Sequence, residues 1–195
     1  MSINPDFKKE IQHYSTFIPP DDVMDLLSDA AEEVRLKPKE ILIRYGQCDP
    51  SLYIVKDGIL QFLYFDGEKE TTFGFAFAPT ILCAPHCMYG HEPSVMQIEA
   101  CKIATTLLRI PENRFYSIMQ SSHEFAQWMF NIALGQFYYS ETKLTMISGH
   151  AVEKYRNLLK IRPDIVKAIS SRRLASYLGV TPSWLCKLRK KMLYE

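Results

Sequence analysis

The stretch that decides the fold of this chain is residues 171–190, SRRLASYLGVTPSWLCKLRK. Apolar residues recur in it at the spacing that two short helices need to face each other across a tight turn. Gly179 can adopt the positive φ that such a turn requires, and Ala175 leaves room for the second helix to approach the first. Thr181 is expected to cap the second helix, with Pro182 at its first position. The residues expected to face inward are Leu174, Leu178, Val180, Leu185 and Leu188.

Polar and cationic side chains remain on the outer face of the second predicted helix. They are Ser183, Trp184, Lys187, Arg189 and Lys190. Small-residue helical hairpins also occur in proteins that never touch nucleic acid, and a cluster of Lys and Arg is commonly a solvated face. Here the apolar, small and capping positions all agree in register, and the cations fall on the helix that would enter a groove. The pattern therefore favours a DNA-binding helix-turn-helix.

Charge is divided unevenly along the 195 residues. Residues 153–195 carry 11 Lys and Arg against 3 Asp and Glu, and residues 1–152 carry 12 against 19. The basic end coincides with the helix-turn-helix, and attraction to phosphates explains this asymmetry. Five cysteines, an odd number without a disulfide framework, favour reduced thiols. No apolar run approaches the roughly 20 residues of a membrane span, and Met1–Glu10 lacks a signal-peptide pattern, so we expect a cytoplasmic protein without a membrane partner.

The N-terminal two thirds are expected to be mainly β-structure after two short helices. Asp57-Gly58 and Asp66-Gly67 are the strongest hairpin signals, because glycine tolerates the left-handed backbone of hairpin turns. Several short strands with regular turns suggest a barrel or sandwich, hence an α+β chain. The expected helices are Asp6–Phe17 and one capped by Asp21 or Asp22 and running to Ala31; the expected strands are Val34–Leu36, Ile41–Arg44, Leu52–Val55, Ile59–Phe65, Thr71–Phe77, Val95–Ala100 and Ala104–Ile110.

A long helix is predicted from His123 to Ile147, after a shorter helix at Arg114–Met119 and a break at Ser121-Ser122. Its 25 residues would span about 37 Å at 1.5 Å per residue. Its apolar residues cover more than one stripe, so one stripe could pack on the barrel and another on a second copy of the helix. The alternative is a core helix wrapped by its own domain. The stripe expected at a dimer interface is Phe125, Met129, Ile132, Tyr139 and Met146.

The predicted organisation has three parts: a β-barrel sensor domain at residues 1–121, a dimerisation helix at 122–147 and an all-α DNA-binding domain at 148–195. In the last part, Ser148 is expected to cap a helix over Ala151–Lys160, and Asp164–Ile169 is expected to bridge into the helix-turn-helix. Too few residues follow the second helix for a β-hairpin wing.

These features together resemble the Crp/Fnr family of bacterial transcription regulators. The resemblance rests on Ile54-Val55-Lys56-Asp57-Gly58, the long helix, and above all Leu174-Ala175-Ser176-Tyr177-Leu178-Gly179-Val180-Thr181-Pro182. It implies a cyclic-nucleotide-binding-type double-stranded β-helix, or jelly roll, and a homodimer on a pseudo-palindromic site in double-stranded DNA, with RNA polymerase as a further candidate partner. It also implies base contacts from Ser183 and Lys187; phosphate contacts are expected from Thr181, Arg189 and Lys190. Arg172 and Trp184 complete the expected DNA-binding set.

The chain departs from the cyclic-AMP-binding members at their phosphate-binding cassette. Those members use a Gly-Glu pair and, about ten residues later, Arg-Ser or Arg-Thr. Here Val95 stands where the Arg belongs and Met96 where the Ser or Thr belongs. Burying a cyclic phosphate without a cationic partner is costly, so we expect that cyclic AMP is not the effector. No cofactor is predicted, and any small-molecule effector is unknown.

Two other functions compete with a plain DNA-binding regulator. Cys83, His86, Cys87 and His91 suit a metal- or redox-responsive regulator, but their spacing matches no standard site, and an ordinary loop of partly buried Cys and His is the favoured explanation. We therefore predict no metal site. A DNA-inactive adaptor with the same fold is the other alternative. An enzyme is not expected, because the sequence lacks the His-x-His pattern of cupins and any catalytic triad.

Overall fold

The computed structural model describes residues 3–65, 67, 70–147, 150–161 and 163–192, with only the backbone described at 142–147, 161 and 164–165. Within these residues the helices are α1 Pro5–Gln12, α2 Asp21–Ala30, α3 Pro85–Gly90, α4 Glu112–Ser121, α5 His123–Ile147, α6 Ala151–Ile161, α7 Pro163–Ala168, α8 Ser171–Leu178 and α9 Pro182–Met192. The strands are β1 Glu32–Leu36, β2 Ile41–Ile43, β3 Leu52–Asp57, β4 Ile59–Phe65, β5 Glu70–Phe77, β6 Ile81–Leu82, β7 Met96–Ala100 and β8 Thr105–Ile110.

The strands form two four-stranded antiparallel sheets, ordered β1-β8-β3-β6 and β2-β7-β4-β5. We call this pair of sheets the β-sandwich. Val55 and Leu107 of the first sheet and Leu60 and Ile98 of the second are all less than 3% exposed and belong to one cluster, so the two sheets share an interior core. The α+β class expected from the sequence is confirmed, and its β-region is a sandwich of two sheets.

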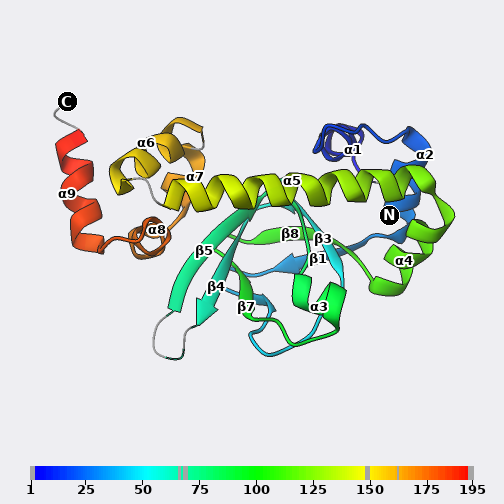
Figure 1. Ribbon diagram of the computed structural model, residues 1–195, viewed down its shortest axis with the longest axis horizontal. Helices are drawn as coiled ribbons and strands as arrows, with labels where there is room; N and C mark the ends of the chain where they lie inside the picture. The colour runs from blue at the N-terminus through cyan, green and yellow to red at the C-terminus, as the bar shows by residue number, and fades with distance from the viewer. Residues whose placement is uncertain (1–2, 66, 68–69, 148–149, 162, 193–195) are drawn as a thin grey trace.

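Helices cover the outer face of the first sheet. Leu52, Ile54 and Leu108 of that sheet cluster with Met24 of α2 and with Trp128 of α5. In Figure 1, α5 runs along most of the molecule, with α1, α2 and α4 near its beginning and α6 to α9 near and beyond its end. The helix therefore connects the β-sandwich to the C-terminal helices, which we call the C-terminal bundle (α6 to α9).

One of the two predicted hairpins is correct and the other is wrong. β4 pairs with β5, Phe65 lies opposite Glu70, and Gly67 between them has φ +95°, while Asp66 lies outside the described residues. β3, however, pairs with β6 and β8 and never with β4, so Asp57-Gly58 carries the chain from one sheet to the other. Gly58 has φ +90° and lies against Thr105 of β8, so this turn needs glycine for close packing as well as for its backbone geometry.

The other differences concern short elements. The short strand β6 and the helix α3 were not expected, and the segment 163–168 is a helix, α7, rather than a bridge. α1 ends at Gln12, and α2 begins after Pro20 without a side-chain cap from an aspartate. The long helix α5 has the predicted bounds. Ser148 lies outside the described residues, and the three domain boundaries stay a prediction. Within the described part of the chain, no helix is long and apolar enough to cross a membrane.

Candidate nucleic-acid interface

The turn between α8 and α9 has the predicted local chemistry. Ser170 caps α8, because its hydroxyl accepts a hydrogen bond from the Arg173 N–H at 3.3 Å. Gly179 follows α8 with φ +71°, and its N–H donates to carbonyls in the last turn of α8. The Thr181 hydroxyl accepts from the Trp184 N–H at 3.2 Å, and Pro182 is the first residue of α9. Both predictions, the Gly179 turn and the Thr181 cap, are confirmed.

A small core holds α8 and α9 together. Tyr155 of α6 and Ile169 are buried with these helices in one cluster, which places the pair within the C-terminal bundle. Of the residues predicted to face inward, Val180 is half-buried and the others are buried: Leu174, Leu178, Leu185 and Leu188. Ala175 is 0% exposed, as expected for the position where the helices approach most closely.

The outer face of α9 is polar and cationic. The exposed residues on it and at its start are Thr181, Ser183, Trp184, Lys187 and Lys190, and Arg172 is exposed at the beginning of α8. Trp184 is 36% exposed, although it is a large aromatic residue. These six predicted DNA contacts are thus accessible to a partner, and the hydroxyl, indole and ammonium groups on α9 can donate to base edges and phosphates.

Arg189, the seventh predicted contact, is oriented differently. Its Nε donates to the Tyr155 hydroxyl at 3.0 Å, its Nη1 donates to the Ser171 hydroxyl at 2.9 Å, and its guanidinium lies 5.7 Å from the centre of the Tyr155 ring. Two of its nitrogens are therefore already used inside the bundle. In this geometry Arg189 ties α9 to α6 and α8, and we propose that it supports the bundle internally instead of contacting phosphate.

The predicted dimer stripe on α5 also needs correction. Phe125, Met129 and Ile132 are 0%, 8% and 7% exposed and pack into the core of their own protomer, so they are not available to a second copy. Tyr139 is exposed, and the side chain of Met146 lies outside the described part of the chain. Three of the five predicted residues therefore face the core of their own protomer, and Tyr139 stays a predicted interface residue.

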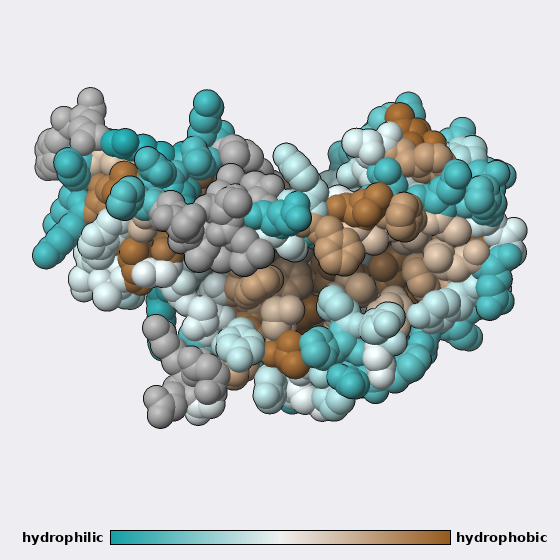
Figure 2. All heavy atoms as spheres, in the orientation of Figure 1, coloured by the Kyte–Doolittle hydropathy of each residue, from teal (hydrophilic) through white to brown (hydrophobic). Residues whose placement is uncertain are grey.

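Another stripe of α5 faces outward. Phe130, Leu134 and Phe137 are 66%, 48% and 72% exposed, and their spacing of four and then three residues places them on one side of the helix. Figure 2 shows apolar side chains gathered over the middle of α5, with the surface hollowed beside them. An exposed apolar stripe of this kind commonly marks an interaction site.

The segment that follows β6 holds α3 and then leads into β7. Residues 81–101 contain no Lys or Arg, Val95 is 37% exposed, and Met96 is half-buried. This segment therefore offers no arginine or lysine to a phosphate.

The four Cys and His residues near α3 do not converge. His86 faces Glu92 at 3.6 Å and His91 faces Glu112 at 3.5 Å, while the buried Cys87 thiol donates to the Gln47 carbonyl at 3.7 Å. Burial raises the pKa of Cys83 to about 11, which disfavours the reactive thiolate. Among the described residues, no group of three or more His, Cys, Asp or Glu is arranged to hold a metal ion.

The structure also has a polar junction between α8 and the β-sandwich that the sequence analysis did not predict. It joins Arg173 and Ser176 of α8 to Glu70 and Thr72 of β5 and to Glu99 of β7. Its members on the two sides are more than 70 residues apart in the chain, and no local pattern marks them.

Residues 33–122 match the family model of the cyclic nucleotide-binding domain. No curated protein matches the chain in sequence. Among solved structures, FixK2 from Bradyrhizobium japonicum is similar with a TM-score of 0.70 and 13% identity, covering 84% of this chain and 85% of its own. The c-di-GMP-responsive global regulator CLP from Xanthomonas campestris has a TM-score of 0.70 and 13% identity, covering 90% and 92%. A regulator described as belonging to the Crp/Fnr family, from Eubacterium rectale, has a TM-score of 0.65 and 20% identity, covering 90% and 84%.

Proposed function

We propose that this chain, which has a cyclic nucleotide-binding domain at residues 33–122 and the fold of Crp/Fnr regulators, is a DNA-binding transcription regulator. It would bind DNA in a sequence-specific manner and would not be an enzyme. The observation that carries this proposal is the exposed, cationic face of α9, held by a capped and well-packed helix pair. The excess of basic residues in 153–195 supports it, because Lys and Arg side chains are attracted to the phosphates of DNA. Such a regulator would work in the cytoplasm.

On DNA, α9 would act as the recognition helix in the major groove. Ser183 and Lys187 are exposed on this helix and would contact base edges, with Trp184 beside them near its beginning. Arg172, Thr181 and Lys190 are exposed where phosphate contacts would position the helix. A symmetric pair of such helices would enter successive grooves about 34 Å apart on a pseudo-palindromic site.

Selection of bound duplexes from a random DNA pool, with purified ligand-free protein at about 0.1 M salt, tests this function. We expect enrichment of a two-fold-symmetric site with half-sites one helical turn apart. Lys187→Ala should relax the preference at one position of each half-site, whereas Lys8→Ala, a change on the distant helix α1, should leave the selected sequence unchanged. Folded protein that enriches no sequence, even with cell extract metabolites added, would favour the DNA-inactive adaptor instead.

The proposed homodimer uses the outward stripe of α5. Phe130, Leu134 and Phe137 follow the spacing of a two-helix seam, and burying them against a second α5 would remove large apolar side chains from water. Phe137→Glu should convert the dimer to a monomer in analytical ultracentrifugation, because two carboxylates would then meet at the seam. Tyr89→Glu is the matched control, since Tyr89 is 95% exposed on α3. An unchanged dimer in Phe137→Glu would place the interface elsewhere.

A further inference from the structure

The C-terminal bundle is docked on the β-sandwich through α8 and β5. The Thr72 backbone N–H donates to the Ser176 hydroxyl at 2.9 Å. Beside this bond, the rings of Phe75 and Tyr177 meet edge to face, with centroids 5.5 Å apart. Phe75 and Phe77 of β5 pack against the same hydrophobic cluster that holds α8 and α9 together. The docking surface is therefore continuous with the core of the helix-turn-helix.

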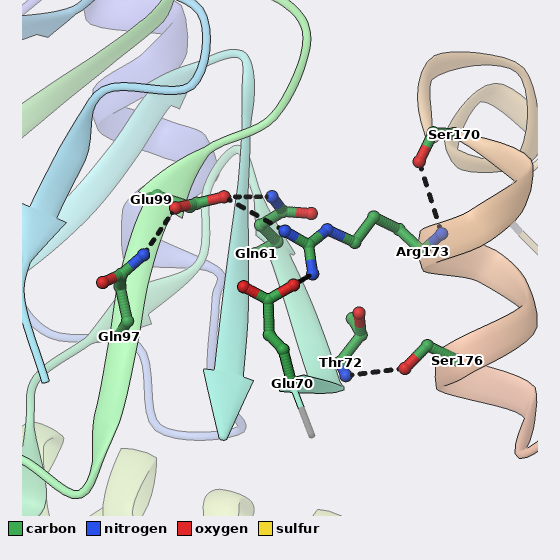
Figure 3. A network of polar contacts seen from close by, with 8 residues as sticks. All are labelled: Gln61, Glu70, Thr72, Gln97, Glu99, Ser170, Arg173 and Ser176. Carbon is green, nitrogen blue, oxygen red and sulfur yellow. Dashed lines mark hydrogen bonds and ion pairs between the residues drawn. The ribbon is translucent and has the colours of Figure 1, made fainter. Parts of the chain in front are cut away.

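Arg173 is the charged centre of this docking surface (Figure 3). Its Nη1 forms an ion pair with Glu70, and its Nη2 lies 3.6 Å from Glu99 Oε1. Glu99 is 8% exposed, and its two oxygens accept hydrogen bonds from the amides of Gln61 at 2.6 Å and Gln97 at 2.7 Å. If α8 moved away, this buried carboxylate would keep its amides and lose its cation, which is unfavourable in a poorly solvated site.

The junction lies between the β-sandwich and the core that positions α9. Glu99 lies on β7, the strand that follows the segment 81–95 around α3. Arg173 lies on α8, one residue before Leu174, which packs in the core that positions α9. The DNA-facing residues of α9 stay exposed in the docked state, so the junction does not cover the recognition surface.

We propose that the junction of Arg173 with Glu70 and Glu99 fixes the orientation of the helix-turn-helix on the β-sandwich. Its consequence for DNA rests on the function proposed above, because a fixed orientation matters most when two recognition helices must fit two half-sites at once. With the junction broken, each α9 would have to be ordered during binding, and affinity for the symmetric site would fall.

The first experiment measures orientation without DNA. Spin labels are attached to Cys48 on the β-sandwich and Cys186 on α9, which are both exposed, in a Cys83→Ser background. Labelled chains are diluted with unlabelled protein, so that pulsed electron resonance reports the distance within one chain. Arg173→Gln should replace one narrow distance distribution by a broad one. Arg35→Gln, which removes another arginine–glutamate pair, with Glu33 on β1, should keep it narrow. An unchanged narrow distribution in Arg173→Gln would overturn the proposal.

The second experiment measures affinity for the selected symmetric site and for unrelated DNA. Arg173→Gln should weaken binding to the symmetric site by about tenfold, a size typical of coupling between two parts of a protein, and should leave binding to unrelated DNA within about twofold. Glu70→Gln, checked by circular dichroism to be folded, should broaden the distance distribution in the same way. The double variant should show little further broadening or loss of affinity beyond that of Arg173→Gln alone. Should wild-type protein bind no DNA, the function proposed above fails, and the distance measurement still decides whether the junction sets the orientation.

Discussion

Arg189 and Lys190 are neighbours on α9 with the same charge, and the structure predicts opposite consequences of replacing them by Ala. Arg189 makes hydrogen bonds to Tyr155 at 3.0 Å and Ser171 at 2.9 Å and a cation–π contact with the Tyr155 ring. For a half-exposed group we count about 0.5–1 kcal/mol for each hydrogen bond and about 0.5 kcal/mol for the ring contact. Arg189→Ala should therefore destabilise the C-terminal bundle by about 2 kcal/mol. Lys190 is exposed, and its replacement should change stability by less than about 0.5 kcal/mol.

Fluorescence and salt dependence separate these two effects. The chain has two tryptophans, so a Trp128→Phe background leaves Trp184 on α9 as the reporter of bundle unfolding in urea. In DNA binding, Lys190→Ala should reduce the slope of log affinity against log salt by about 0.9 for each protomer, or about 2 for a dimer. Arg189→Ala should leave that slope nearly unchanged under conditions where the bundle is folded. If Arg189→Ala reduces the slope and leaves stability intact, our assignment of Arg189 to internal support is refuted.

Three further predictions concern the β-sandwich. Calorimetry with micromolar cyclic AMP should show no heat of binding, because residues 81–101 lack Lys and Arg; a clear binding isotherm would contradict this. Gly58→Ala should lower the free energy of unfolding in urea by at least about 3 kcal/mol, because its Cβ would lie 2.5 Å from Thr105 Oγ1. Gly46→Ala is the control: Gly46 has φ +79° and nothing within 4 Å, so the loss should be only about 1–2 kcal/mol. Equal losses in the two variants would refute the steric argument. Burial raises the pKa of Cys83 to about 11 and that of Cys101 to about 12, so these thiols lose their protons at lower pH in the unfolded chain than in the folded one. The free energy of unfolding should therefore fall between pH 9 and 11, by up to about 1.4 kcal/mol per pH unit for each thiol. In Cys83→Ser this fall with pH should be less steep.

Local chemistry explains which parts of the structure could be predicted from the sequence. The bounds of α5, the turn at Gly179 and the cap at Thr181 depend on residues within a few positions of each other. Helix periodicity, positive φ at glycine and a hydroxyl three residues before an N–H are short-range properties, so the sequence contains them directly. The accessible, cationic face of α9 follows from the same local pattern.

Pairing between distant segments explains the errors. Asp57-Gly58 has hairpin chemistry, yet β3 joins β8 and β6, because strand order in a two-sheet fold is set by which apolar faces can be buried together. Similarly, α5 has two apolar stripes, and the packing of the first sheet against Phe125 decides which of them faces inward.

The amino-acid sequence by itself thus determined that this chain carries a capped, basic helix-turn-helix behind a β-rich region and a long helix. Only the tertiary structure decided the partners of the individual charges. Arg173 and Arg189 have the same side chain and lie in the same motif, but one pairs with carboxylates of the β-sandwich and the other with a tyrosine of its own bundle. The physical reason is that a guanidinium can reach many acceptors, and the packing of remote strands and helices fixes which acceptor lies within its reach.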